Sequence, residues 1–135
     1  MKKTILVVED ERLSRTVIVA ILESHGLNCI AAENGQQALE LLTIKHCDLI
    51  LTDLRMPIVD GISLIKNVRR REKLLGINKT IPIVVLSAET GEMVNAAIEL
   101  GVSDCFVKSS PFDKLIPKLK QLLGEIVWEK QLRPH

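Results

Sequence analysis

Short runs of aliphatic residues alternate along the chain with segments in which apolar residues recur every three or four positions. The runs predict strands at 4–9, 27–32, 48–52, 81–87 and 104–108. The first, third and fourth runs are nearly continuous isoleucine, leucine and valine, which is typical of parallel strands covered on both faces. The pattern therefore predicts a buried parallel sheet.

The segments between these runs have the periodicity of amphipathic helices, each with an apolar stripe that would face the sheet. Asn34-Gly35 is a start signal for the second helix, and the fourth is expected to end before Gly101. The predicted stripes are Leu13, Val17, Ala20 and Ile21; Ala38, Leu39, Leu41 and Leu42; Ile62, Leu64, Ile65 and Val68; Val94, Ala97 and Ile98; and Phe112, Leu115, Leu119, Leu122 and Ile126.

Strand and helix alternate five times, which predicts an α/β fold with a doubly wound sheet. The handedness of strand–helix–strand connections allows few topologies. Among the two common strand orders we favour the flavodoxin-like (βα)5 arrangement with parallel order 2-1-3-4-5. We expect one domain over residues 1–124, with 125–135 as a C-terminal extension or linker.

Composition narrows the class of protein. The 135 residues are 47% hydrophobic but only 2% aromatic, so we expect one domain with an aliphatic core. A net charge of +1 argues against nucleic acid or a membrane surface as a partner, and we interpret the basic run Arg69-Arg70-Arg71 as a solvated helix end. The cysteines Cys29, Cys47 and Cys105 show no metal or disulfide spacing, and the N-terminal apolar run is too short for a signal peptide. We therefore expect a cytoplasmic protein.

Polar residues occur where the predicted strands end. Glu9 and Asp10 end the first strand, Asp53 follows the third, Ser87 ends the fourth and Lys108 ends the fifth. Because parallel strands share one carboxyl edge, these side chains should meet there, with the three acids in the crevice where the strand order reverses.

Three converging carboxylates repel one another, so that either one keeps its proton or a divalent cation joins them. Oxygen ligands on a wet edge favour Mg²⁺ or Mn²⁺. A metal ion, the Lys108 ammonium and the Ser87 hydroxyl together suit a phosphoryl group, and a carboxylate such as Asp53 can accept that group as an aspartyl-phosphate.

Four strings in this order resemble the receiver domain of two-component response regulators, over about residues 3–124: VVEDE at 7–11, DLRMPIVDG at 53–61, LSAET at 86–90 and FVKSSPF at 106–112. Receivers have five parallel strands in the order 2-1-3-4-5. The long segment 69–80 resembles loops of receivers attached to hybrid sensor histidine kinases, so an attached kinase or output domain is a further expectation, as is a homodimer.

The resemblance implies a role for each residue at the predicted edge. Asp53 would accept a phosphoryl group from phosphohistidine on a sensor histidine kinase or histidine phosphotransfer domain. Asp10, Asp53 and the backbone carbonyl of Arg55 would bind Mg²⁺, with Glu9 acting through a bound water. Ser87 and Lys108 would contact the phosphoryl oxygens, and Gly61 would shape the loop after the acceptor.

Two positions depart from the receiver pattern. Cys105 stands where receivers usually have an aromatic switch residue, while Phe106 follows one place later. Receivers usually have proline directly after the lysine, whereas here Ser109-Ser110 precedes Pro111. These departures put the usual aromatic switch and the placement of Lys108 in question.

We predict a switch that phosphorylates and dephosphorylates itself, and not a metabolic enzyme. The alternative is a receiver-like interaction module that phosphate does not regulate, which the departures around Lys108 motivate. A third hypothesis is an aspartyl-nucleophile hydrolase. Such enzymes usually carry a DxDxT motif, but here Leu54-Arg55 follows Asp53, so the second acid is missing.

Overall fold

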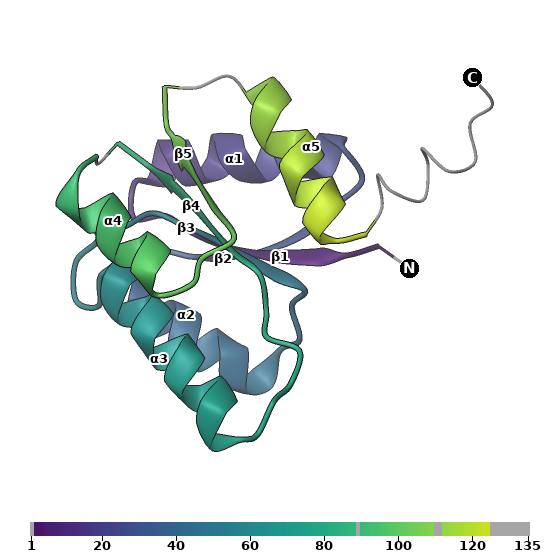
Figure 1. The fold of residues 1–135 in the computed structure, drawn as a ribbon. Coiled ribbons are helices and arrows are strands. Elements are labelled where there is room, and N and C mark those ends of the chain that lie inside the picture. The colour runs from purple at the N-terminus through teal and green to yellow at the C-terminus, as the bar shows by residue number, and fades with distance from the viewer. Residues whose placement is uncertain (1, 89, 110–111, 125–135) are drawn as a thin grey trace, which may run out of the picture.

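The computed structural model describes residues 2–88, 90–109 and 112–124, in which five strands and five helices alternate along the chain (Figure 1). The strands pair in parallel in the order β2-β1-β3-β4-β5. This is the predicted flavodoxin-like doubly wound fold. The elements are β1 (Thr4–Val8), α1 (Arg12–Ser24), β2 (Asn28–Ala32), α2 (Gly35–Ile44), β3 (Leu49–Thr52), α3 (Gly61–Leu74), β4 (Ile83–Ser87), α4 (Glu92–Glu99), β5 (Asp104–Val107) and α5 (Phe112–Leu122).

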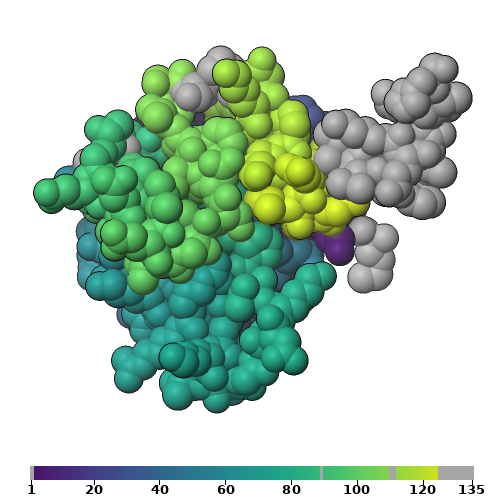
Figure 2. All heavy atoms as spheres, in the orientation of Figure 1, coloured from purple at the N-terminus to yellow at the C-terminus, as the bar shows by residue number. Residues whose placement is uncertain are grey.

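The aliphatic runs form the centre of the sheet because helices cover both of its faces. In the register, Leu6 of β1 pairs with Ile50 of β3, which pairs with Ile83 of β4. Helices α2, α3 and α4 pack on one face of the sheet, and α1 and α5 on the other (Figure 1). In the space-filling view α3, α4 and α5 make up much of the visible surface, with the light-green region of β5 between α4 and α5 (Figure 2). Side chains that alternate along each strand therefore enter two separate aliphatic clusters.

The predicted apolar stripes of α2 and α3 are confirmed. The side chain of Asn34 accepts a hydrogen bond of 2.8 Å from the Gln37 N–H, which starts α2 as predicted. Asp60 starts α3 in the same way through the Ser63 N–H at 2.8 Å. The buried residues on these two helices include Ala38, Leu39, Leu64, Ile65 and Val68.

The predicted stripe of α1 is wrong except for Ile21, which packs against the sheet. Leu13 is 72% exposed and Val17 is 44% exposed, while Ile18 and Leu22 are buried against the sheet. Apolar residues lie around most of this helix, so helical spacing alone fits more than one buried face. Contact with the sheet decides between them, and it also leaves Ile98 of α4 exposed.

No helix in the described ranges is long and apolar enough to cross a lipid bilayer. The predicted extension 125–135, with Ile126, lies outside the described residues. The boundary after residue 124 therefore stays a prediction.

Candidate functional site

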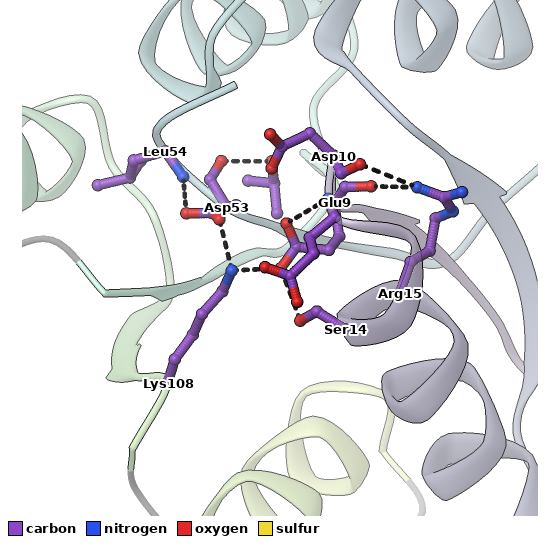
Figure 3. Close-up of polar contacts among 9 residues, drawn as sticks. Glu9, Asp10, Ser14, Arg15, Asp53, Leu54 and Lys108 are labelled. Atoms are coloured by element: carbon purple, nitrogen blue, oxygen red, sulfur yellow. Dashed lines mark hydrogen bonds and ion pairs between the residues drawn. The ribbon is translucent and has the colours of Figure 1, made fainter. Parts of the chain in front are cut away.

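The three acids predicted to meet at the carboxyl edge of the sheet do so. Glu9 and Asp10 follow β1, and Asp53 follows the neighbouring strand β3. One carboxylate oxygen from each lies within 4.8 Å of the others, and Figure 3 shows the three side chains gathered around one point. They lie where the strand order reverses. The chain leaves β1 toward β2 on one side and leaves β3 toward β4 on the other, which opens a crevice between the ends of β1 and β3.

Asp53 is buried but is surrounded by hydrogen-bond donors. Its own N–H donates to the Val8 carbonyl at 3.0 Å, which ties the start of the loop to β1. The Leu54 N–H donates to Oδ1 at 2.7 Å, and the Lys108 ammonium donates to Oδ2 at 2.7 Å. Each oxygen of this buried carboxylate therefore has a hydrogen-bond donor as its partner.

Lys108 connects two of the acids. Its Nζ contacts Asp53 Oδ2 and also forms an ion pair with Glu9 Oε1 (Figure 3). Burial by itself would lower the pKa of Lys108, but the hydrogen bonds to Asp53 and Glu9 outweigh it and hold that pKa above its usual value. Lys108 is therefore a cation at neutral pH and reaches the site although no proline follows it directly.

Glu9 and Asp10 differ in their surroundings. Glu9 is 1% exposed, and its Oε1 accepts a hydrogen bond of 2.9 Å from the Ser14 hydroxyl in addition to the ion pair with Lys108. Its Oε2 faces the Glu11 N–H at 3.4 Å. Asp10 is exposed at the rim of the site. The protein thus already binds Glu9 tightly, whereas Asp10 is accessible to a ligand from solvent.

Ser87 and Arg55 complete the predicted set. Ser87 is buried at the end of β4, and its carbonyl accepts a hydrogen bond of 3.0 Å from the Lys108 N–H. Because Thr52 pairs with Val85, Ser87 lies one residue beyond the position opposite Asp53. Arg55 is exposed, and its guanidinium contacts Met93 Sδ at 3.7 Å. The role of its backbone carbonyl as a metal ligand stays a prediction.

The donor set fits a hard divalent cation. Glu9, Asp10 and Asp53 offer only carboxylate oxygens, and Lys108 offsets one of their three charges. Oxygen ligands of this kind, with Asp10 open to water, match the preference of Mg²⁺ and Mn²⁺ for carboxylates together with several bound waters.

The loop that follows Asp53 is fixed in place by two glycines. The Gly61 N–H donates to the Leu54 carbonyl at 2.8 Å, and the Gly35 N–H donates to the Val59 carbonyl at 2.9 Å. A Cβ at position 61 would lie 2.2 Å from the Asp53 carbonyl oxygen, and a Cβ at position 35 would lie 2.4 Å from the Val59 oxygen. Only glycine lets the backbone approach this closely, so the structural role predicted for Gly61 is confirmed.

Replacing Gly61 by alanine should displace the backbone of Asp53 and Leu54. Overpacking against backbone atoms costs about 1–3 kcal/mol, so we expect a loss of this size in the free energy of unfolding measured with urea. The amide signals of Asp53 and Leu54 should move in a ¹H–¹⁵N spectrum. Gly26→Ala is the control, because a Cβ there meets open space. Alanine at this positive φ is strained, but the strain is local to position 26, so the amide signal of Asp53 should not move. Unchanged amide signals in Gly61→Ala would contradict the proposed clash.

Cys105 and Phe106 pack on opposite faces of the sheet. Cys105 is half-buried against the cluster under α2–α4, and Phe106 is half-buried against the cluster under α1 and α5. Burial, with a contribution from Asp104, raises the pKa of the Cys105 thiol. It is therefore a neutral thiol at pH 7 that serves as a small apolar side chain. Ser110 and Pro111 lie outside the described residues.

Two polar residues at this site were not predicted. Ser14 and Arg15 lie in the first turn of α1, and both contact the acidic segment: the Ser14 hydroxyl bonds Glu9 Oε1, and the Arg15 guanidinium bonds the Glu9 and Asp10 carbonyls. Ser14 lies four residues before buried Ile18, and residues spaced by four lie on the same side of a helix. This spacing places Ser14 on the side of α1 that faces the sheet. The misassigned stripe of α1 hid that signal.

The hollow beside the acids is too small for an organic substrate. The space lined by Glu9, Thr52 and Asp53 is a gap too narrow to admit a water molecule. A larger cavity of about 480 Å³ opens at the opposite edge of the sheet, between Leu42, Val68 and Leu123, far from these acids along their strands. Organic ligands usually fill pockets of about 300–1,000 Å³, so the acid site suits a small inorganic group presented from outside.

Comparison with known proteins agrees with this arrangement. The family model of the response regulator receiver domain matches residues 5–120. The phosphate regulon transcriptional regulatory protein PhoB of Pseudomonas aeruginosa is 37% identical over 123 residues, which cover 90% of this chain and 52% of that protein. The chain spans 26% of the length of other transcriptional regulators that it matches.

Two solved structures show the same fold. The receiver domain of Saccharomyces cerevisiae Ssk1, crystallised with the histidine phosphotransfer protein Ypd1, matches with a TM-score of 0.80 at 27% identity, covering 90% of this chain and 88% of that one. The response regulator TrrA of Thermotoga maritima, solved in complex with Mg²⁺-BeF, matches with a TM-score of 0.74 at 30% identity, covering 89% and 98%. With the fold, the acid cluster and the matched span in agreement, this chain belongs to the family of response regulator receiver domains.

Proposed function

We propose that Asp53 accepts a phosphoryl group from a phosphohistidine, with Mg²⁺ or Mn²⁺ bound at the acid cluster, and that this event switches the domain. The observation that carries the proposal is the setting of the Asp53 carboxylate. Its Oδ1 is held by the Leu54 N–H, and its Oδ2 faces Lys108 beside Glu9 and Asp10. A fixed carboxylate next to a cation is equipped to attack phosphorus.

In the proposed step, Asp53 Oδ2 forms a bond to phosphorus while the bond between phosphorus and the donor histidine nitrogen breaks. Lys108 pairs with the oxygens of the incoming group, and the Ser87 hydroxyl donates to one of them. A bound divalent cation would offset the charge of those oxygens and of the acids. Positioning and charge neutralisation account for the reaction, so we propose a self-modifying switch and not a metabolic enzyme.

The switch itself would arise from competition for Lys108. Without phosphate, Lys108 is bound to Asp53 and Glu9. A phosphoryl group carries more charge than a carboxylate, so it would draw Lys108 and Ser87 toward itself at the ends of β5 and β4. A swing from 1:99 to 99:1 needs about 5.5 kcal/mol of differential stabilisation, of which these new bonds would supply part.

The expected partners are a sensor histidine kinase or a histidine phosphotransfer domain. Leu13 is 72% exposed shortly after Asp10, and Ile58 is 80% exposed shortly after Asp53. Large exposed apolar side chains next to a polar site suit contact with another protein. Because the chain spans only part of its relatives, an attached kinase or output domain remains a proposal, as do a homodimer and a cytoplasmic location.

Phosphoryl transfer from a small-molecule donor tests the proposal. Purified protein is incubated with acetyl phosphate, with and without Mg²⁺, and the modified peptide is identified by mass spectrometry. We expect one alkali-labile phosphoryl group on Asp53 that forms only with the metal present. Modification of a different residue, or none with Mg²⁺ bound and the fold intact, would contradict the proposal. The second of these outcomes would favour the interaction module that phosphate does not regulate.

A further inference from the structure

The backbone of the acidic segment is held from two sides. The Glu9 N–H donates to the Ala32 carbonyl of β2 at 3.0 Å. On the other side, the Arg15 guanidinium donates through Nη1 to the Glu9 carbonyl at 2.8 Å and to the Asp10 carbonyl at 3.4 Å (Figure 3). These contacts fix the two peptide groups that flank the Asp10 Cα, and with them the direction in which its carboxylate leaves the chain.

Ser14 fixes the other carboxylate of the pair. It lies on the side of α1 that also carries buried Ile18 and Leu22, spaced by four residues, so its hydroxyl faces the sheet. That hydroxyl donates to Glu9 Oε1 at 2.9 Å. Glu9 is thereby held toward α1 and Lys108, which leaves Asp10 as the acid exposed to solvent.

We propose that Ser14 and Arg15 are positioning residues that orient Glu9 and Asp10 for the divalent cation. This inference rests on the proposed function, because it concerns the metal that would act there. Partners that hold metal ligands in place typically account for 10–100-fold in metal affinity. Neither side chain needs to touch the metal for this effect.

Arg15 gives the test a definite sign. A guanidinium close to the site repels a divalent cation, so electrostatics alone predicts that removal of the charge strengthens Mg²⁺ binding. Positioning predicts the opposite, because the acidic segment loses its anchor. Arg12 is the matched control, since it is an exposed arginine in the same first turn and its removal changes the net charge equally.

The experiment measures Mg²⁺ affinity of the whole chain by isothermal titration calorimetry, without any phosphoryl donor. We expect about 10-fold weaker binding in Arg15→Met, partial recovery in Arg15→Lys, and unchanged or slightly tighter binding in Arg12→Met. Circular dichroism and urea unfolding show whether each variant is folded. Equal or tighter binding in folded Arg15→Met would overturn the proposal for Arg15.

Ser14→Ala tests the second residue without a change in charge. We expect several-fold weaker Mg²⁺ binding, whereas Thr16→Val should bind as the native protein does, since the Thr16 hydroxyl donates to the Arg12 carbonyl within the helix. Native-like affinity in Ser14→Ala would overturn the role of Ser14. If the native chain bound no Mg²⁺, the proposed function itself would fail. If the native chain bound Mg²⁺ and the variants bound it equally well, only the positioning role would fail, so the two failures are distinguishable.

Discussion

Asparagine in place of Asp53 should abolish phosphoryl incorporation from acetyl phosphate while leaving the fold intact. An amide oxygen is a far weaker nucleophile than a carboxylate and cannot form the acyl phosphate. The side-chain oxygen of asparagine can still accept the hydrogen bond from the Leu54 N–H that Oδ1 accepts in the native protein. Loss of one acid relieves repulsion from Glu9 and Asp10 but also removes one partner of Lys108, which keeps its ion pair with Glu9. We therefore expect little net change in stability.

Asp60→Asn is the matched control for this substitution. Asp60 lies in the same loop and starts α3 by accepting a hydrogen bond of 2.8 Å from the Ser63 N–H, which asparagine accepts equally well. Its phosphorylation should therefore equal that of the native chain in the same mass-spectrometric assay. Persistent, metal-dependent modification of Asp53→Asn would show that another residue is the acceptor.

Alanine in place of Glu72 should produce the largest loss of stability among these variants. Glu72 is 7% exposed, and its Oε1 accepts a hydrogen bond of 2.7 Å from Arg69 while its Oε2 accepts one of 2.6 Å from the Ile81 N–H. Arg69 also donates to the carbonyls of Ile81 and Gly101. The pair thus fastens the end of α3 to the segment that enters β4.

Removal of one partner from a buried ion pair typically costs 3–5 kcal/mol because the other charge is left unpaired. Arg69 keeps two carbonyl partners, so we expect about 3 kcal/mol in urea unfolding for Glu72→Ala. Glu72→Gln should lose less, since its amide oxygen can still accept from the Ile81 N–H. Glu40→Ala, at an exposed position of α2, is the control and should stay within about 0.5 kcal/mol of the native value. A similarly small loss in Glu72→Ala would show that the Arg69–Glu72 pair does not fasten α3 to the segment before β4.

The sheet and the acid cluster were predictable because both depend on short-range patterns. Aliphatic runs identify buried parallel strands, and parallel strands necessarily bring the residues after them to one edge. Glu9 and Asp53 are separated in sequence by α1, β2, α2 and β3, yet the pairing of β1 with β3 makes them neighbours. The order β2-β1-β3-β4-β5 then decides which strand ends border the crevice.

Features that depend on three-dimensional contact were not predictable in the same way. The orientation of α1 is set by its contact with the sheet, so neither the exposure of Leu13 nor the approach of Ser14 to Glu9 follows from helical spacing. The basic run at the end of α3 was interpreted as solvated, but Arg69 bonds Glu72, and Arg71 bonds the Leu39 carbonyl at 3.1 Å. The hydrophobic periodicity of a helix does not reveal which of its charged residues will bond to a group distant in sequence or to a buried acid.

The contact of Lys108 with both Glu9 and Asp53 has a consequence for ionic strength. At physiological salt the Debye length is about 8 Å, well beyond the 2.7 Å that separates Lys108 Nζ from Asp53 Oδ2. Dissolved ions cannot enter between partners so close and so poorly exposed to water. Salt should therefore act on the encounter with a charged phosphodonor, while it leaves the charge balance around Asp53 almost unaltered.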